Sequence, residues 1–226
     1  MTISILGTQE EELMDKTEKY IPALSFRWLT PLYDPFLKWG MREETFKHHL
    51  IQQAHLKSVM RVLDLGCGTG TLTILIKQTH PETEVVGIDG DLAVLEIARS
   101  KANQAGVNIT LDYGMAYQLP YPNNSFDRVL SSLVFHHLST DNKQRGMHEI
   151  YRILRSGGEL HIVDFGKPQG IYARLISPVM RALEDADDNI QGLLPEMILN
   201  AGFNRVEEAV QYTTIVGGLS LFRAKK

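Results

Sequence analysis

Three groups of residues in this chain have types and spacings that could do chemistry. In the first group, glycines stand at positions 66, 68 and 70, directly after the apolar segment 62–65. A glycine-rich turn between a strand and a helix lets backbone N–H groups approach an anionic or polar ligand closely. The alternative is that these glycines only form an ordinary strand-to-helix corner. At this spacing and in this context, the pattern favours a ligand site.

Asp89 is the second group, nineteen positions after Gly70 and at the end of the apolar segment 85–88. Its two carboxylate oxygens could accept hydrogen bonds from both hydroxyls of a ribose, although it could instead cap the following helix. A dinucleotide-binding loop has glycine at its first, third and sixth positions, whereas the sixth position here is Thr71. The spacing therefore disfavours a nicotinamide cofactor and an oxidoreductase.

His136, His137 and Asp164 form the third group, and each is a candidate base for deprotonating an oxygen or nitrogen acceptor. The histidines follow an expected strand, 126–131, and the aspartate ends another, 159–165. In open α/β sheets these carboxyl ends face the ligand crevice, so the three side chains are expected there. Each also has a structural alternative, since a histidine can simply hydrogen-bond to backbone and hold the loop.

Metal binding is not predicted. His48, His49 and His55 lie on or near one expected helix, but no carboxylate-rich motif accompanies them. We assign no metal.

The elements that must position these residues alternate between strand-like and helix-like segments from residue 61 onward. Such an order specifies a parallel sheet covered by helices on both faces. Strands are expected at 62–65, 85–88, 107–113, 126–131, 159–165, 205–211 and 213–223, the last two close enough for a hairpin. Helices are expected at 43–56, 71–78, 92–104, 143–154, where Gly157 and Gly158 end the helix, and 194–201.

Two parts of the chain fall outside this alternation. Prolines interrupt residues 1–40, which we expect to form two or three short helices. We divide the chain into an N-terminal helical lid segment, 1–57, and a main domain, 58–226. The insertion 167–190 is expected to contribute to the acceptor pocket, with its acidic cluster 184–188 as a solvated turn. The lid aromatics could line that pocket or merely pack the cap: Phe26, Trp28, Tyr33, Phe36 and Trp39.

Composition limits the classes of protein that this chain could be. It has 226 residues, of which 43% are hydrophobic and 22% charged, so a disordered, collagen-like or coiled-coil chain is excluded. The net charge of −4 and the lack of a basic run before Lys225 disfavour nucleic acid as a partner. A single cysteine predicts a reducing, cytoplasmic setting, and the acidic N-terminal stretch predicts neither a signal peptide nor a membrane span.

Five stretches in fixed order carry a resemblance to a known family. They read Val-Leu-Asp-Leu-Gly-Cys-Gly-Thr-Gly at 62–70, Val-Gly-Ile-Asp at 86–89, Leu-Pro-Tyr-Pro with Ser-Phe-Asp at 119–127, Val-Phe-His-His-Leu at 134–138 and Arg-Ile-Leu-Arg-Ser-Gly-Gly-Glu-Leu at 152–160. Together they resemble class I S-adenosylmethionine-dependent methyltransferases, closely over 61–165 and more loosely beyond. The Leu-Tyr-Asp at 32–34 is similar to the small-molecule enzymes of ubiquinone and menaquinone biosynthesis.

The resemblance implies a Rossmann-like three-layer α/β/α sandwich. Its sheet would have seven mostly parallel strands with an antiparallel last strand, and an N-terminal helical lid would cover it. S-adenosyl-L-methionine would be the cofactor and S-adenosyl-L-homocysteine the product. The implied cofactor-binding residues are Tyr33, Asp64, Gly66, Cys67, Gly68, Asp89, Gly90, Leu92, Met115, Ala116, Ser131 and Leu133.

Within this implied set, Asp64 lies near the cofactor amino group, Asp89 holds the ribose and Leu92 packs on the adenine. The family turn that contacts the adenine edge usually reads Gly-Asp-Ala, whereas this chain has methionine at position 115. The adenine amino group would therefore lose one acceptor, which weakens recognition by ~1 kcal/mol.

These observations predict transfer of a methyl group to a small, apolar or aromatic molecule by in-line displacement, a reaction that depends mainly on positioning. No Asn-Pro-Pro-Tyr loop follows the fourth strand, and the only cysteine lies in the glycine loop, so DNA base methylation and arsenite methylation are disfavoured. The alternatives are a non-catalytic protein that binds S-adenosylmethionine or S-adenosylhomocysteine, and a non-methylating reaction at the same site. The methylated atom, the use of a base, and the choice between monomer and homodimer stay open.

Overall fold

The computed structural model describes residues 43–167, 187–214 and 217–226. The expected N-terminal helices, with Tyr33 and the other lid aromatics, lie outside the described residues, as does most of the insertion. In the part that is described, no helix is long and apolar enough to cross a membrane.

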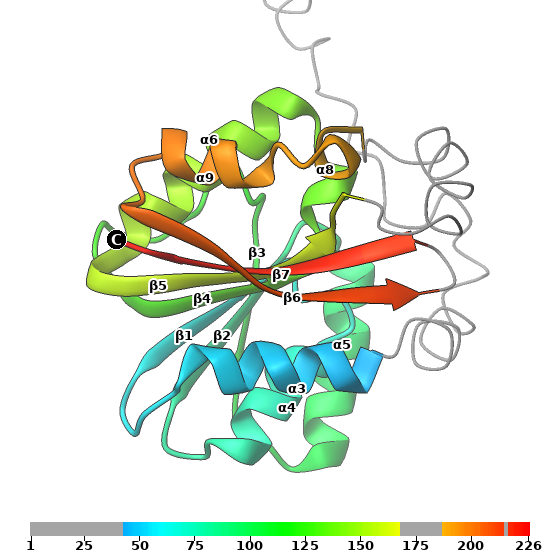
Figure 1. Cartoon of the computed structure of the whole chain (residues 1–226). Helices are drawn as coiled ribbons and strands as arrows, with labels where there is room; N and C mark the ends of the chain where they lie inside the picture. The colour runs from blue at the N-terminus through cyan, green and yellow to red at the C-terminus, as the bar shows by residue number, and fades with distance from the viewer. Residues whose placement is uncertain (1–42, 168–186, 215–216) are drawn as a thin grey trace, which may run out of the picture.

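A seven-stranded sheet forms the centre of the described chain, in the order β3-β2-β1-β4-β5-β7-β6 (Figure 1). Strands β1 to β5 pair in parallel, while β7 is antiparallel to both β5 and β6. The expected α/β sheet with an antiparallel last strand and a terminal hairpin is therefore confirmed. The strands are β1 Arg61–Leu65, β2 Glu84–Asp89, β3 Thr110–Tyr113, β4 Phe126–Ser132, β5 Leu154–Phe165, β6 Arg205–Thr214 and β7 Gly217–Lys225.

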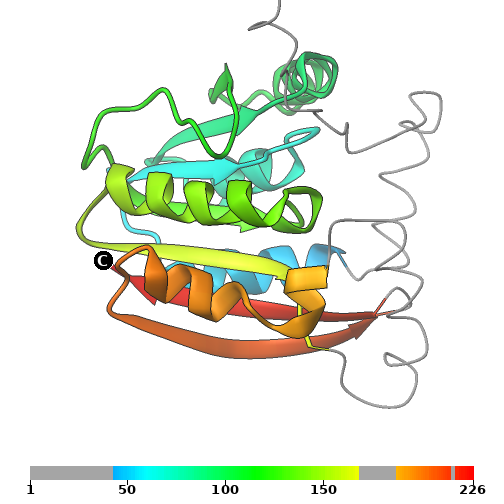
Figure 2. The ribbon, with the colours of Figure 1, turned by 90° about the horizontal axis from the view of Figure 1, so that it is seen from above.

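Helices cover both faces of the sheet, which makes three layers (Figures 1 and 2). One face carries α3 (Glu43–Ala54), α4 (Thr71–Thr79) and α5 (Leu92–Ala105). The other carries α6 (Thr140–Ile153), α8 (Asp187–Gln191) and α9 (Leu194–Asn200). Each face has its own buried apolar cluster, because the central strands are apolar on both sides.

Local sequence signals explain where the helices begin and end. The Asp91 side chain accepts a hydrogen bond from Ala93 N and caps α5, and Gly106 ends that helix with a φ of 64°. Ser139 caps α6 through Asn142 N. Buried side chains recur every three or four residues along α6, which keeps its apolar face on the sheet.

Two expected boundaries are wrong. The third strand begins at Thr110 rather than at 107, because Val107 N still donates to Ala102 O in the turn that ends α5. Gly157 and Gly158 do not end a helix: α6 stops at Ile153 and the glycines lie inside β5.

The expected solvated turn at 184–188 is also wrong where the structure describes it. Asp187 and Asp188 lie in α8, and Asp188 Oδ2 pairs at 3.1 Å with Nζ of the fully buried Lys143 on α6. The acidic side chain is therefore a partner for a buried cation.

The first described helix, α3, lies on the N-terminal side of the boundary proposed at residue 57. Its Phe46, Leu50 and Ala54 are completely buried in the cluster on this face of the sheet. The division into a lid segment and a main domain stays a proposal.

Candidate active site

The glycine loop after β1 is held between two neighbouring elements. Gly66 and Gly70 have φ values of 68° and 78°, in the left-handed region that favours glycine. A Cβ on Gly66 would lie 2.4 Å from a methyl carbon of Val134 in the loop after β4. A Cβ on Gly70 would lie 2.9 Å from that of Ala98 on α5. Close packing therefore requires glycine at both positions.

Gly68, between them, faces open space. Its φ is 53°, and a Cβ built there would meet no atom within 4 Å. A ligand can thus approach the backbone here without displacing a side chain. The loop therefore fits the close approach of a cofactor.

Asp89 ties this loop to the end of β2. Its Oδ2 accepts a hydrogen bond from Gly68 N at 2.8 Å, and its Oδ1 accepts one from Asp91 N at 2.9 Å. Because Asp91 caps α5, the helix-capping alternative for Asp89 does not hold. Burial raises the pKa of Asp89, although backbone N–H groups of Gly68, Asp91 and Gly90 oppose that rise. Two bonds leave further lone pairs on this carboxylate, which fits a ribose with two hydroxyls.

Asp64 and Cys67, by contrast, are buried. Thr73 Oγ1 donates to Asp64 Oδ2 at 2.6 Å, and burial raises the pKa of Asp64 to about 6. Burial also raises the pKa of the Cys67 thiol above its ordinary value, so this cysteine stays protonated. It packs against Gly87, where a Cβ would come within 3.0 Å of its sulfur.

The expected adenine side of the site carries exposed apolar side chains. Leu92, the first residue of α5, is 58% exposed. Tyr113, which pairs in register with Asp89 at the end of β3, is 54% exposed. Sequence reasoning missed Tyr113, although its place directly before Gly114 was a usable signal.

The remaining expected residues on this side lie on short turns. Gly90 is half-buried in the turn between Asp89 and α5. Met115 and Ala116 are half-buried as well, and Met115 O accepts a hydrogen bond from Gln118 N at 3.0 Å.

The loop after β4, which precedes the two histidines, contacts the glycine loop. Leu133 adopts a φ of 60°, which is strained for leucine, and donates its N–H to Val163 O at 2.9 Å. The next residue, Val134, presses on Gly66. Ser131 is buried and donates its hydroxyl to Leu65 O at 3.1 Å, which joins β4 to β1.

His136 is paired with Asp164. It lies on the 3₁₀ turn η2 (Phe135–His137) and is 5% exposed, with Nδ1 at 2.8 Å from Asp164 Oδ1. Its ring packs edge-on against Phe165 and lies 3.9 Å, between centroids, from the ring of His137. A hydrogen bond to a carboxylate requires the proton on Nδ1, so in the neutral ring the acceptor lone pair is on Nε2.

Asp164 is fully buried among donors. Its Oδ2 accepts hydrogen bonds from Val134 N and Phe135 N at 3.1 and 2.8 Å. Burial by itself would raise its pKa, but the His136 imidazole and the backbone donors outweigh that effect and lower the pKa. This geometry favours Asp164 as the residue that orients His136 over a direct role as base, and its catalytic role stays a prediction.

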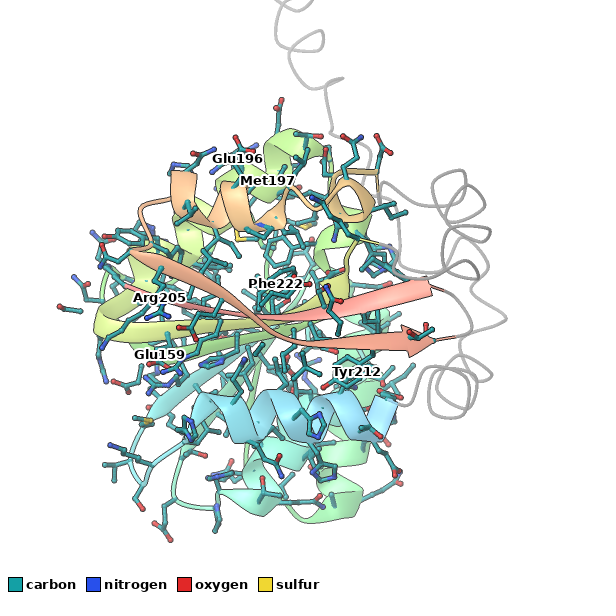
Figure 3. All side chains as sticks on the ribbon, viewed as in Figure 1. Glu159, Glu196, Met197, Arg205, Tyr212 and Phe222 are labelled. Atoms are coloured by element: carbon teal, nitrogen blue, oxygen red, sulfur yellow. The ribbon has the colours of Figure 1, made fainter. Side chains whose placement is uncertain are left out.

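The structure therefore brings most of the expected site residues to one edge of the sheet, at the carboxyl ends of β1, β2, β4 and β5. Tyr33 lies outside the described residues. His49 is used elsewhere, since its Nδ1 lies 2.6 Å from the hydroxyl of Tyr212, which points from β6 toward α3 (Figure 3). The described part of the chain has no group of three or more side chains that could hold a metal ion.

Comparisons with known proteins identify the family of this chain. A family model described as "Methyltransferase domain" matches residues 62–158. A demethylmenaquinone methyltransferase of Deinococcus radiodurans is 31% identical over 88% of this chain and 85% of the relative. The enzyme with the same description in Listeria welshimeri is 29% identical over 94% of both chains.

A solved structure shows the same fold. The [4+2]-cyclase SpnF superposes with a TM-score of 0.68 at 18% identity, covering 88% of this chain and 92% of its own. From the glycine loop, the sheet order and the relatives together, this chain belongs to the class I S-adenosylmethionine-dependent methyltransferases.

Proposed function

We propose that this protein methylates a small, apolar or aromatic molecule, with His136 as the base that activates it. The observation that carries the proposal is the contact between two loops. Val134 presses on Gly66, so the turn that bears the Asp164-bound imidazole lies directly against the glycine loop. A base and a methyl donor must share one small space for an in-line transfer, and this contact supports such an arrangement.

The cofactor would be held by the loop and by the ends of β2 and β3. Asp89 would accept hydrogen bonds from the ribose hydroxyls, and Gly68 would allow the cofactor to approach the backbone. Leu92 and Tyr113 would cover the adenine with apolar surface, in a site where Met115 offers no carboxylate. S-adenosylmethionine supplies an electrophilic methyl group on its sulfonium. The remaining implied contacts, including Tyr33, belong to the same proposal.

His136 would take a proton from a hydroxyl of the acceptor at Nε2. Asp164 would stabilise the resulting imidazolium, because its carboxylate keeps the proton on Nδ1. Loss of that hydroxyl proton makes the acceptor oxygen, or a ring carbon conjugated to it, a better nucleophile. His137, in contact with the His136 ring, stays the second candidate for this role.

The acceptor class is suggested by the relatives. Two of them are demethylmenaquinone methyltransferases, and their similarity extends over most of this chain. We therefore propose an aromatic ring that carries hydroxyl groups, in the size range of a quinol. The lid segment 1–57 and the insertion 167–190 would complete its pocket.

Binding is the first test of this proposal. Calorimetric titration with S-adenosylmethionine, S-adenosylhomocysteine and NADH should show micromolar binding of the two adenosyl compounds and none of NADH. Hydroxylated naphthalene and benzene rings would then be screened for methyl transfer by mass spectrometry. Binding of the cofactor without transfer to any acceptor would favour the non-catalytic or non-methylating alternative, and no binding would contradict the proposal altogether.

The base is tested by substitution. His136→Gln should lower kcat by about 10²–10⁴, the usual contribution of a general base. His148→Gln is the matched control, because His148 is an exposed histidine on α6 that bonds to Gln144 O. Equal rates in the two variants would contradict the role of His136.

A further inference from the structure

Helix α8 is fastened beside the His136–Asp164 pair by two consecutive side chains. Asp188 Oδ2 accepts a hydrogen bond from Thr140 Oγ1 at 2.7 Å, in addition to its ion pair with Lys143. The next residue, Asn189, is fully buried and donates from Nδ2 to Asp164 Oδ1 at 3.1 Å. One side chain thus attaches α8 to α6, and its neighbour reaches the buried carboxylate.

That carboxylate oxygen is shared among three donors. Asp164 Oδ1 accepts from His136 Nδ1 at 2.8 Å and from Phe165 N at 2.7 Å, as well as from Asn189. The other donors to Asp164 are backbone groups of Val134 and Phe135. Among the described residues, Asn189 is the donor that comes from an element separate from β5 and the turn after β4.

The other end of the Asn189 amide is unsatisfied. Its Oδ1 is buried and has no hydrogen-bond partner within the described residues. A buried carbonyl without a partner is unfavourable, and leucine would fill nearly the same volume without that cost. Packing alone therefore does not explain an amide at this position, whereas its hydrogen bond to Asp164 does.

We propose that Asn189 is a positioning residue for His136 that acts through Asp164, which rests on the proposed function in taking His136 as the base. The amide holds the plane of the carboxylate. It also disperses the negative charge of Asp164, which limits how strongly that carboxylate attracts a proton to His136. Within the described residues, the titratable groups on the elements packed near the pair include His137 on η2, Lys143 on α6 and Asp188 on α8.

The test is an NMR titration of the His136 imidazole in ¹⁵N-histidine-labelled protein, with S-adenosylhomocysteine present. Asn189→Leu should raise the pKa of His136 by about 0.5–1 unit, since a carboxylate with fewer donors attracts the imidazolium more strongly. Thr140→Val is the matched control, because it removes one hydrogen bond that holds α8 without touching Asp164. It should leave the pKa of His136 unchanged.

The outcomes separate the two proposals. No rise in Asn189→Leu, or an equal rise in both variants, overturns the inference about Asn189. Asn189→Ala repeats the test should the leucine variant unfold, and thermal unfolding of each variant verifies the fold. The titration requires neither an acceptor nor turnover. A rise in the pKa of His136 in a protein that transfers no methyl group would therefore support the action of Asn189 on His136 through Asp164, and it would contradict the proposal that His136 is the base of a methyl transfer.

Discussion

Three aspartates near the same sheet edge differ in how their surroundings shift the pKa of the carboxyl group. Burial raises the pKa of Asp64 to about 6, because one threonine hydroxyl does not replace water around it. Burial raises the pKa of Asp89 as well, although three backbone N–H groups oppose the rise. Asp164 is fully buried, yet the His136 imidazole and the backbone donors keep its pKa below the ordinary value. The imidazole partner together with these donors therefore sets Asp164 apart from the other two carboxylates.

Replacing Asp89 tests the cofactor contact at the residue scale. Asp89→Ala should weaken binding of S-adenosylmethionine by ~1.5–3 kcal/mol, roughly 10- to 150-fold in Kd, because a charged acceptor for the ribose is lost. Calorimetry measures this directly. Asp91→Ala is the control, since it removes the cap of α5 while Asp89 remains. An unchanged affinity in Asp89→Ala would rule out the proposed contact.

Asp64 should make the unfolding free energy depend on pH. Its folded pKa of about 6 lies above the ordinary 3.8, so the folded state binds the proton more tightly than the unfolded state. Stability from this group is present below pH 3.8 and is lost as the pH rises to 6, by up to about 3 kcal/mol. Asp64→Asn should remove that loss. Urea unfolding of both proteins between pH 4 and 7 measures this effect. If the unfolding free energies of the two proteins changed with pH in parallel, the prediction for Asp64 would be wrong.

At the scale of elements, the site depends on loops that approach each other more closely than side chains normally allow. The turn after β4 lies on the glycine loop through Val134, and Leu133 accepts a strained conformation to place it there. On the opposite side of that turn, α8 reaches Asp164 through Asn189. The first contact joins two loops, and the second joins a helix to a strand.

Two alanine substitutions separate close packing from backbone strain. Gly66 and Gly68 both have positive φ, so alanine costs about 1 kcal/mol of strain at either position. At Gly66 the new methyl also clashes with Val134, which should add about 1–3 kcal/mol, whereas at Gly68 it meets open space. Gly68→Ala should instead lower cofactor affinity, because its methyl fills ligand space.

Thermal or urea unfolding and calorimetry measure the two effects. Adding Val134→Ala to Gly66→Ala should recover part of the lost stability. Equal unfolding free energies for Gly66→Ala and Gly68→Ala would contradict the close approach of the two loops.

On the scale of the whole molecule, the two ends of the sheet have different roles. The carboxyl end carries the site, while an ion cluster joins strands at the other end. Glu159 on β5 pairs with Arg223 on β7 at 2.7 Å and lies 3.7 Å from Arg128 on β4. Arg128 Nε in turn donates to Ala54 O at the end of α3. Figure 3 shows Glu159 and Tyr212 toward opposite ends of the strands.

This cluster predicts a second pH dependence of stability, opposite in sign to that of Asp64. The imidazole of His161 and the two guanidinium groups lower the pKa of Glu159 from 4.5 to about 2. The contribution of Glu159 to the unfolding free energy is therefore present above pH 4.5 and is lost as the pH falls through 2. Glu159→Gln should flatten the unfolding free energy between pH 2 and 5, measured by urea unfolding. If the unfolding free energy of Glu159→Gln fell between pH 5 and 2 as it does in the unchanged protein, the cluster would not stabilise the fold.

Much of the fold follows from local patterns. Apolar runs, glycines and the alternation of segments predicted every described strand and most helix ends, because these signals act over a few residues. Two of the errors concern residues whose surroundings include partners far away in the sequence. Gly157 and Gly158 resemble a helix end, yet they lie in β5, where a Cβ on Gly158 would meet Arg155 O at 2.9 Å and Asp127 O at 3.2 Å. Asp188 resembles a solvated acid, yet a buried lysine on α6 pairs with it.

By itself, then, the sequence determined the sheet class, the cofactor family and the group of residues at the carboxyl ends of the strands, since motif spacing and strand order suffice for these. The tertiary structure alone decided that Asp91 and not Asp89 caps α5, and that Asp164 holds His136. It also decided that Asn189 reaches Asp164 across 25 residues of chain. The physical reason is that a hydrogen bond depends on positions within a few tenths of an ångström, and those are set only when distant elements pack together.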